Sequence, residues 1–290
     1  MTAVDPLVEP GLRLGAALAR MDAVVVAFSG GVDSALLAHA ALGELGPDRV
    51  LAVTAASASL ADGELDHCRE LAGDWGLPWT SVATSELQRA DYVANGGDRC
   101  FWCKDSLMDA LLPLADGRGA FVALGVNVDD LGDHRPGQDA ARRRGARFPL
   151  VDAGLDKAAV RDLARARGLA VWDRPANPCL ASRVPYGTAV TVSVLSQVDR
   201  AEAAVRRLGV RDVRVRHHGD TARIEVPTSE IDLVMAAADE LVAALTSLGY
   251  RYVTVDLAGL RSGNLNQALG DVAAAPPDVG AAAGRSADAR

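Results

Sequence analysis

The sequence predicts an α/β protein in which a doubly wound parallel sheet is followed by a smaller C-terminal α+β domain. Apolar runs of strand length alternate with helical patterns as far as residue 168, as a series of βαβ units requires. The first run, 24–28, leads directly into a glycine turn and a helix. After 184–192 the pattern changes to a helix, a hairpin and a second helix. We therefore expect domains at 1–187 and 188–269, and a disordered tail at 270–290.

The composition describes an acidic protein with enough apolar residues for a large core. Of 290 residues, 49% are hydrophobic, and 30 Lys and Arg face 38 Asp and Glu, for a net charge of −8. This balance argues against a broad basic surface for nucleic acid. We expect no membrane span, because no apolar run reaches about 18 residues. Asp5 and Glu9 interrupt the N-terminus, which lacks the apolar core of a signal peptide, so we expect a cytoplasmic protein.

The N-terminal domain should begin with a helix over residues 12–21, and the strands of the sheet follow it in the chain. Ligands of a doubly wound sheet bind at the carboxyl ends of its strands, so the loops there are the candidate site. Gly46-Pro47 should end the first helix of the sheet. The expected strands cover 24–28, 50–54, 79–84, 120–125 and 148–151, and the later helices cover 62–75, 100–114 and 157–168.

The glycine turn has the composition of a phosphate site. Two glycines allow a close backbone approach, and the free N–H groups of the following helix point at the same place. Asp33 or Ser34 should cap that helix. The turn is not a Walker A loop, because no Gly-Lys-Ser/Thr follows. The residues expected to bind nucleotide here are Ser29, Gly30, Gly31, Val32, Asp33 and Ser34.

Other strand ends should complete the nucleotide site. Small residues after the second strand, Ala55 and Ser57, would let an adenine approach. The fourth strand ends at Gly125 and Asn127, before a loop rich in carboxylates. Mg²⁺ prefers oxygen ligands. Its candidate ligands are Asp33, Asp129, Asp130 and Asp133.

Three cysteines lie beside the loops of the expected site. Cys100 and Cys103 are one helical turn apart, so both thiols can face the same way, and Cys179 lies in a later loop. Three thiolates suit zinc, a [4Fe–4S] cluster with one open iron, or redox chemistry of the C-x-x-C pair. Unrelated buried cysteines explain the same pattern. Cys68 lies in a helical pattern and should be a structural thiol.

The C-terminal domain should consist of helices at 192–208 and 231–248 with strands at 210–216, 222–226 and 251–257. Arg214 and Arg216 share one face of their strand, with Glu225 opposite on the paired strand, which suits phosphate or carboxylate recognition. A solvated sheet edge explains the same alternation. The segment His217–Asp220 should be an exposed turn, and Arg142–Arg144 a solvated helix face.

The turn Ser29–Ser34 resembles the PP-loop of ATP pyrophosphatases, whose fold is of the adenine nucleotide alpha hydrolase type. Across nearly the whole chain the sequence resembles the LarE-type sulfur transferases. The segments that carry this resemblance are Ser29–Ser34, Arg135–Gly137, Cys179–Gly187, Val213–Arg216, Ala222–Glu225, Arg251–Asp256 and Arg261–Gly263.

The resemblance implies an ATP-dependent enzyme that adenylylates the carboxylates of a pyridinium dicarboxylate mononucleotide and replaces AMP with sulfur. The products serve the nickel-pincer nucleotide cofactor. In members without the C-x-x-C pair, the cysteine that matches Cys179 gives up its own sulfur. Because Cys100 and Cys103 are present, this chain resembles the subgroup in which three cysteines hold a [4Fe–4S] cluster. The family assembles as a hexamer.

The same resemblance suggests roles for two basic residues. Lys104 lies beside the cysteine pair and could neutralise the charge of the acyl phosphate; Arg183 of the Cys179 motif is a further candidate catalytic residue. Competing interpretations are a PP-loop tRNA thiolase, against which the net charge counts, and a nucleotide-binding subunit without catalysis. An amide-forming synthetase is less favoured, because no glutaminase domain is attached.

Overall fold

The computed structural model describes residues 7–132 and 136–261. Its larger sheet has four parallel strands in the order β3-β2-β1-β4. The α/β fold class is thereby confirmed, and the strands lie where the apolar runs predicted them. Their bounds are β1 Val24–Ala27, β2 Val50–Ala56, β3 Trp79–Ala83 and β4 Phe121–Leu124.

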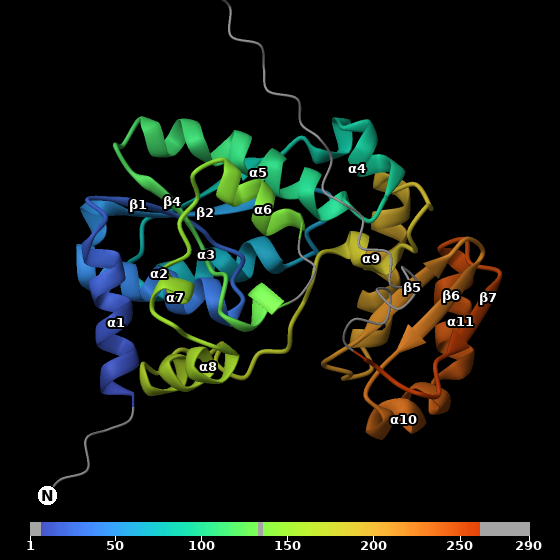
Figure 1. Cartoon of the computed structure of the whole chain (residues 1–290). Coiled ribbons are helices and arrows are strands. Elements are labelled where there is room, and N and C mark those ends of the chain that lie inside the picture. The colour runs from blue at the N-terminus through green and yellow to red at the C-terminus, as the bar shows by residue number, and fades with distance from the viewer. Residues whose placement is uncertain (1–6, 133–135, 262–290) are drawn as a thin grey trace, which may run out of the picture.

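Helices cover both faces of this sheet (Figure 1). Side chains alternate along β1, so that Val24 and Val26 pack in one core and Val25 packs in the other. One layer contains α1 Val8–Ala19, α2 Val32–Leu45, α3 Glu64–Trp75 and α8 Lys157–Ala166. The opposite layer contains α5 Arg99–Asp116 and α6 Pro136–Arg143.

The predicted fifth strand is wrong. Residues Pro149–Asp152 form a short helix, α7, and this region contributes to the sheet only an isolated bridge between Ala123 and Arg147. Pro149 has no N–H to donate to a strand ladder, and its fixed φ fits the first turn of a helix. The segment between β3 and α5 contains a short helix, α4 Ala90–Ala94, that the sequence did not predict.

The second sheet has three strands in the order β5-β6-β7, antiparallel and then parallel. Its bounds are β5 Arg214–His218, β6 Thr221–Glu225 and β7 Tyr252–Val255. Helices α9 Val192–Arg206, α10 Ile231–Ala236 and α11 Ala238–Ser247 pack with these strands in a separate core. The single helix predicted over 231–248 is thus two helices, which meet at Ala237.

The predicted turn at His217–Asp220 is also partly wrong. Both histidines belong to β5, and the turn is confined to the following Gly219 and Asp220. Gly219 has φ +64°, a conformation that glycine adopts without strain. His217 is buried, and its Nδ1 lies 3.2 Å from the hydroxyl of Tyr250.

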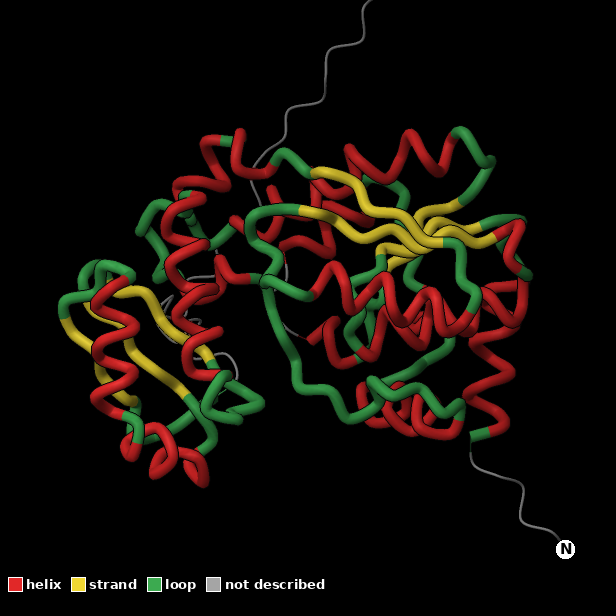
Figure 2. The backbone as a smooth tube through the Cα atoms, turned by 180° about the vertical axis from the view of Figure 1, so that it is seen from behind, coloured by secondary structure: helices red, strands yellow, loops and turns green. Residues whose placement is uncertain are grey.

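Figure 2 shows the two sheets apart, with α9 and the preceding loop between them. A small core joins α4, the 180–190 segment and α9, through Tyr92, Leu180 and Leu195 among others. The division at residues 187 and 188 stays a prediction, and the predicted tail lies outside the described residues. Within the described ranges, no helix has the length and apolarity needed to cross a membrane.

Candidate active site

The turn between β1 and α2 is closed by its own serines. Ser34 Oγ accepts a hydrogen bond from the Ser29 N–H at 3.2 Å and donates one to the Gly31 carbonyl at 3.0 Å. The residue at the N-cap of α2 is Gly31, and no side chain caps the helix, so the predicted cap by Asp33 or Ser34 is wrong. The helix N-terminus is consequently left for an anion.

The backbone conformation and the close packing at position 30 require glycine. Its φ is +69°, and an added Cβ would lie 2.9 Å from His67 Cδ2 and 3.0 Å from Cys68 Sγ. Its carbonyl accepts a hydrogen bond from Arg174 Nη1 at 3.3 Å. Cys68 is completely buried here, which agrees with the structural role predicted for it.

The end of β4 approaches the same turn. A Cβ on Gly125 would lie 2.7 Å from the Ser34 backbone nitrogen, so only glycine allows this approach. Buried Asn127 donates to Asp33 Oδ1 at 3.0 Å. The structure thus brings Gly125 and Asn127 to the turn, and it adds Lys157, whose Nζ lies 2.5 Å from Asp33 Oδ2.

The carboxylates proposed for Mg²⁺ are largely engaged in the loop itself. Asp129 Oδ2 accepts from the Lys157 backbone N–H at 2.9 Å, and Asp130 Oδ2 accepts from the Asn127 backbone N–H at 3.1 Å. Asp133 lies outside the described residues. Within the described ranges, no three His, Cys, Asp or Glu side chains are arranged to hold a metal ion.

At the end of β2, Ala55 and Ser57 are half-buried. Ser57 Oγ lies 2.8 Å from Ser59 Oγ, which in turn donates to buried Glu86 at 3.2 Å. The prediction for Ala55 and Ser57 stays a prediction.

The three thiols come from two segments. Cys100 and Cys103 lie in the first two turns of α5, and Cys179 directly precedes the short 3-10 helix Leu180–Arg183. Desolvation raises the pKa of Cys100 and Cys103, the latter to about 12, and the neighbouring Cys179 raises both further. Lys104 opposes this increase at both pKa values. The thiols therefore share one electrostatic environment.

Arg99 and Asn95 hold the two cysteine segments together. Arg99 Nη1 donates to the Ala181 carbonyl at 2.8 Å and to Asn95 Oδ1 at 2.6 Å. Asn95 Nδ2 donates to the Pro185 and Thr188 carbonyls at 2.8 and 2.9 Å. Both side chains are buried. No local sequence pattern marks Asn95 as a site residue, because its partners are about 90 residues away.

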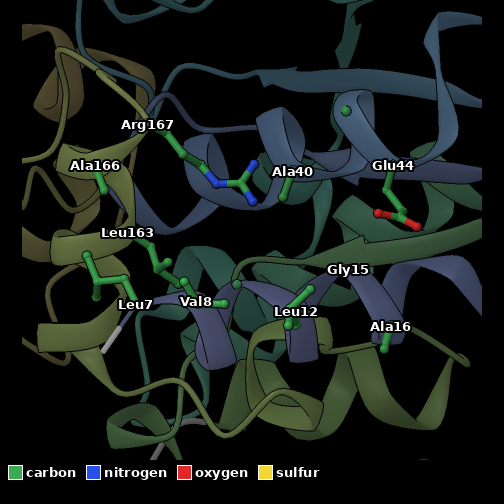
Figure 3. Close-up of a pocket in the computed structure, with 12 residues that line it drawn as sticks. Leu7, Val8, Leu12, Gly15, Ala16, Ala40, Glu44, Leu163, Ala166 and Arg167 are labelled. Carbon is green, nitrogen blue, oxygen red and sulfur yellow. The ribbon is translucent and has the colours of Figure 1, made fainter. Parts of the chain in front are cut away.

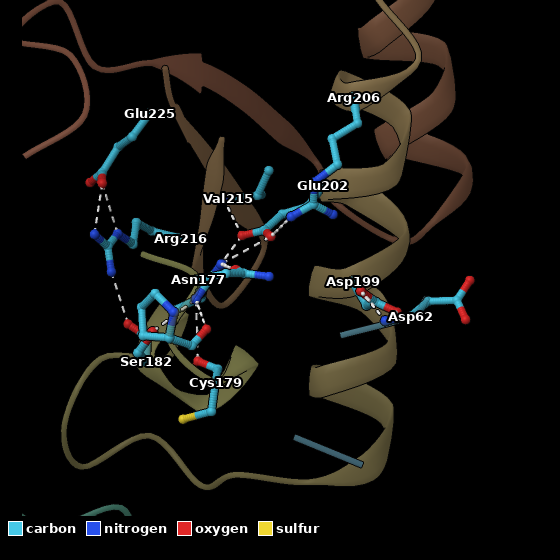
Figure 4. Close-up of polar contacts among 12 residues, drawn as sticks. Asp62, Asn177, Cys179, Ser182, Asp199, Glu202, Arg206, Val215, Arg216 and Glu225 are labelled. Carbon is cyan, nitrogen blue, oxygen red and sulfur yellow. Dashed lines mark hydrogen bonds and ion pairs between the residues drawn. The ribbon is translucent and has the colours of Figure 1, made fainter. Parts of the chain in front are cut away.

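Arg183 supports the Cys179 loop from within. Its guanidinium donates to the Pro178 carbonyl and to Asn177 Oδ1, and it pairs with Glu202 of α9 at 2.7 Å. Both members of the ion pair are buried. The sulfur of Cys179 points away from this network in Figure 4. Arg183 is therefore placed to position the loop.

Arg214 and Arg216 are buried, so the alternative of a solvated sheet edge is wrong for them. Arg216 pairs with Glu225 at 2.8 Å and donates to the Ser182 carbonyl at 2.8 Å (Figure 4). Arg214 lies opposite Glu225 in the register, as predicted, but no described residue gives it an ion pair or hydrogen bond. Desolvation lowers the pKa of Arg214, and Arg183 and Arg216 lower it further.

The arginine run on α6 is only partly a solvated face. Arg142 and Arg143 are exposed, as predicted. Arg144, just beyond the helix, forms ion pairs with Asp105 at 2.7 Å and Asp109 at 2.8 Å on α5. These pairs attach α6 to the helix that begins with the cysteine pair.

Two hollows on the described part of the surface bear on the position of the site. One, of about 610 Å³, lies among α1, α2 and α8 and contains none of the predicted site residues (Figure 3). The other, of about 390 Å³, is lined by His67 and Arg174 beside the glycine turn, and by Asn177 beside the Cys179 loop. Arg211 and Asp212, which precede β5, close it on the other side. No predicted site residue lines this second hollow either, but its lining residues neighbour the glycine turn and the Cys179 loop.

Comparisons with known proteins agree with this geometry. The family described as NAD synthase matches residues 12–94, which contain the glycine turn. The pyridinium-3,5-bisthiocarboxylic acid mononucleotide synthase of Lactiplantibacillus plantarum is 40% identical over 88% of this chain and 93% of its own length. The chain belongs to the LarE family. It is therefore an ATP-dependent sulfur transferase built on a PP-loop.

Two further relatives are uncharacterized proteins. One, from Synechocystis, is 44% identical over 86% of this chain and 94% of its own length. The other, from Methanocaldococcus jannaschii, is 22% identical over 82% of this chain and 91% of its own length. The similarity thus extends through both sheets.

Proposed function

We propose that this LarE protein adenylylates the carboxylates of pyridinium-3,5-biscarboxylic acid mononucleotide and converts them to thiocarboxylates for nickel-pincer nucleotide synthesis. The name of the Lactiplantibacillus relative supports the product, and the PP-loop supports the activation. The acceptor would lie in the hollow between the PP-loop and the Cys179 loop.

Activation would begin with attack of a substrate carboxylate oxygen on the α-phosphorus of ATP. The bond from that phosphorus to the bridging oxygen breaks, and pyrophosphate leaves with the electron pair. The turn N–H groups and the α2 N-terminus stabilise the charge that develops on it. Mg²⁺ would accompany ATP, with Asp33 as the candidate ligand at the turn. A sulfur nucleophile then attacks the acyl carbon, and AMP leaves.

The observation that supports the sulfur half is the hydrogen bond from Arg99, next to Cys100, to the carbonyl of Ala181, two residues from Cys179. It joins the segments that carry the three cysteines. Their thiols are not arranged as a metal site within the described residues, but three thiolates are the ligands that a [4Fe–4S] cluster with one open iron would need. Such a cluster would supply an inorganic sulfur that is replaced between turnovers. The second candidate is sacrificial use of Cys179, which its exposed position favours.

Anaerobic reconstitution with iron and sulfide distinguishes these sulfur sources. With a cluster, we expect visible absorbance, bound iron and sulfide, and an unchanged protein mass after turnover. Substitution of Cys103 by Ser should remove the absorbance, while Cys68→Ser should keep it. Absence of a cluster, with loss of about 34 Da (one H₂S) from the protein after turnover, would overturn the cluster in favour of sacrifice of Cys179.

Arg214 is the stronger candidate for the phosphate of the mononucleotide, because Arg216 is engaged with Glu225 and Ser182. A buried guanidinium without a described acceptor is suited to bind an anion. Replacing both arginines by Ala should raise the KM of the acceptor strongly and that of ATP little. Unchanged acceptor kinetics would contradict this role. We also expect the protein to be a cytoplasmic homohexamer. Sedimentation analysis, which gives the mass of the assembly in solution, tests the hexamer.

A further inference from the structure

Side chains connect the PP-loop to the Cys179 loop along the second hollow. Arg174 Nη1 donates to the Gly30 carbonyl at 3.3 Å, and Arg174 Nη2 donates to Glu64 Oε1 at 2.7 Å. The same Glu64 oxygen accepts from Asn177 Nδ2 at 2.9 Å. All three connecting residues line the hollow. Glu64, the first residue of α3, therefore joins a residue that contacts the PP-loop to one that precedes Cys179 by two positions.

The backbone around Asn177 is irregular, since residues 174–179 lie outside the helices and strands. Pro175 and Pro178 lie in this segment and have no N–H to donate. The position of the segment consequently depends on side chains. Asn177 bonds in both directions, because its Nδ2 reaches the Glu64 carboxylate and its Oδ1 accepts from Arg183 Nη2 at 3.0 Å.

Glu64 gives the Cys179 loop an attachment different from the two supports described above. Arg99 attaches the loop to α5, and Arg183 attaches it to α9 through Glu202. Glu64 attaches it to the PP-loop. The Glu64 side chain is only 13% exposed, and a shielded hydrogen bond to a charged acceptor is stronger than a neutral one in water. This attachment therefore fixes the distance between the two loops.

That distance affects the rate of sulfur transfer, because activation takes place at one loop and sulfur arrives from the other. Reacting atoms must approach to about 3–3.5 Å, and a misplacement of about 1 Å can cost roughly 100-fold in rate. We propose that Glu64 is a positioning residue for sulfur transfer, which holds the Cys179 loop within reach of the acyl adenylate at the PP-loop. It moves no proton and forms no bond to the substrate. This role rests on the proposed function, whose two half-reactions it aligns.

Two assays of the full chain separate positioning from activation. Acceptor-dependent exchange of pyrophosphate into ATP measures activation, and thiocarboxylate formation measures sulfur transfer. We expect Glu64→Ala to lower the kcat of transfer by about 10- to 100-fold, while exchange changes by less than about threefold. Glu64→Gln keeps an oxygen that can accept both hydrogen bonds, so it should recover most of the transfer rate. Glu64→Ala combined with Asn177→Ala should be no slower than the slower single variant, because the two residues act as one unit.

Asp66→Ala is the matched control, since it removes a carboxylate from the same turn of α3, where the pair with Arg69 is exposed. Both of its rates should stay unchanged. Equal losses of exchange and transfer in Glu64→Ala would show a general structural role and overturn the proposal, as would undiminished transfer. Asn177→Ala, at an exposed position, repeats both assays should Glu64→Ala unfold.

Hydrogen exchange tests the attachment without any acceptor. Deuterium uptake over residues 176–183 should be at least about fivefold faster in Glu64→Ala than in wild type, because local opening of the loop becomes easier. Unchanged uptake would overturn the role of Glu64. Wild-type protein that forms no thiocarboxylate would instead overturn the proposed function, and the uptake would still decide whether Glu64 holds the loop.

Discussion

Glu202 is the residue on which the buried charges of the Cys179 loop converge. Its carboxylate accepts from Arg183 at 2.7 Å, from Arg206 at 2.8 Å and from the Val215 backbone N–H at 3.0 Å. The side chain is 0% exposed. Removing one partner of such a pair leaves an uncompensated buried charge.

We therefore expect Glu202→Gln to lower the free energy of unfolding by about 3–5 kcal/mol. Urea unfolding measures this change. Glu9→Gln is the control, since its pair with Arg13 is exposed and should contribute less than about 1 kcal/mol. Equal effects of the two substitutions would contradict the importance of the buried network.

His217 should make stability depend on pH. Desolvation lowers its pKa in the folded protein below the ordinary 6.5. As the pH falls through about 6.5, the unfolded chain takes up a proton at His217 before the folded protein does. The contribution of neutral His217 to the free energy of unfolding is therefore fully present above about pH 6.5 and is lost below it. His217→Phe should show a smaller fall in unfolding free energy than wild type between about pH 7.5 and 5.5. Identical falls would contradict the assignment.

For single residues, the sequence predicted which side chains share a face of a strand but not whether they are buried. The alternation of Val and Arg correctly placed Arg214 and Arg216 on one face. Arg216 donates to the carbonyl of Ser182, which lies 34 residues earlier and which the alternation alone could not indicate. His217 was misread for a similar reason, because its partner Tyr250 is distant in sequence.

Among the elements, the PP-loop depends on the conformation and the small size of Gly30. Gly30→Ala should destabilise the protein by about 1–3 kcal/mol, because φ is +69° and His67 Cδ2 would lie 2.9 Å from the new Cβ. Thermal unfolding and ATP affinity should both decrease.

Gly43→Ala, within α2, is the matched control. Its Cβ would meet no atom within 4 Å. Because alanine is the better helix former, this substitution should stabilise by about 0.5–1 kcal/mol. The two alanine substitutions should thus have opposite signs, and a shared sign would contradict the steric argument.

Most elements were predictable because the periodicity of their apolar residues is strong. The four strands of the large sheet and the helix α8 lie within a few residues of their predicted bounds. The errors occur where local chemistry outweighs an apolar pattern. Pro149 turned an apolar run into helix α7, and an amphipathic run over 231–248 divides at Ala237.

In the whole molecule, the Cys179 loop is supported by both predicted domains. Arg99 holds it from α5, and Glu202 holds it from α9 through Arg183. A chain of residues 1–187 lacks Glu202 and the apolar face of α9. We expect limited proteolysis to cut this chain at 177–187, whereas a 1–261 chain should resist cleavage there. Equal protection would contradict this dependence.

Sequence patterns predicted the PP-loop and the three cysteines but not the side chains that connect them. The six residues Ser29–Ser34 are consecutive in the chain, so a sequence pattern was sufficient to identify them as an anion site. Arg174, Arg99 and Lys157 act across the fold, and an isolated basic residue in a helix or loop has no distinguishing pattern. Contacts at long sequence separation can be established only from coordinates.

The double support of the Cys179 loop has a consequence for how this protein could be recombined. A chimera that joins its nucleotide-binding half to a foreign C-terminal half would keep the anion turn, since that turn is closed by hydrogen bonds among Ser29, Gly31 and Ser34. It would lose the acid that Arg183 requires, and with it the alignment of Cys179. Such a chimera should therefore still activate a carboxylate. Transfer of sulfur to that carboxylate should require both halves of this chain.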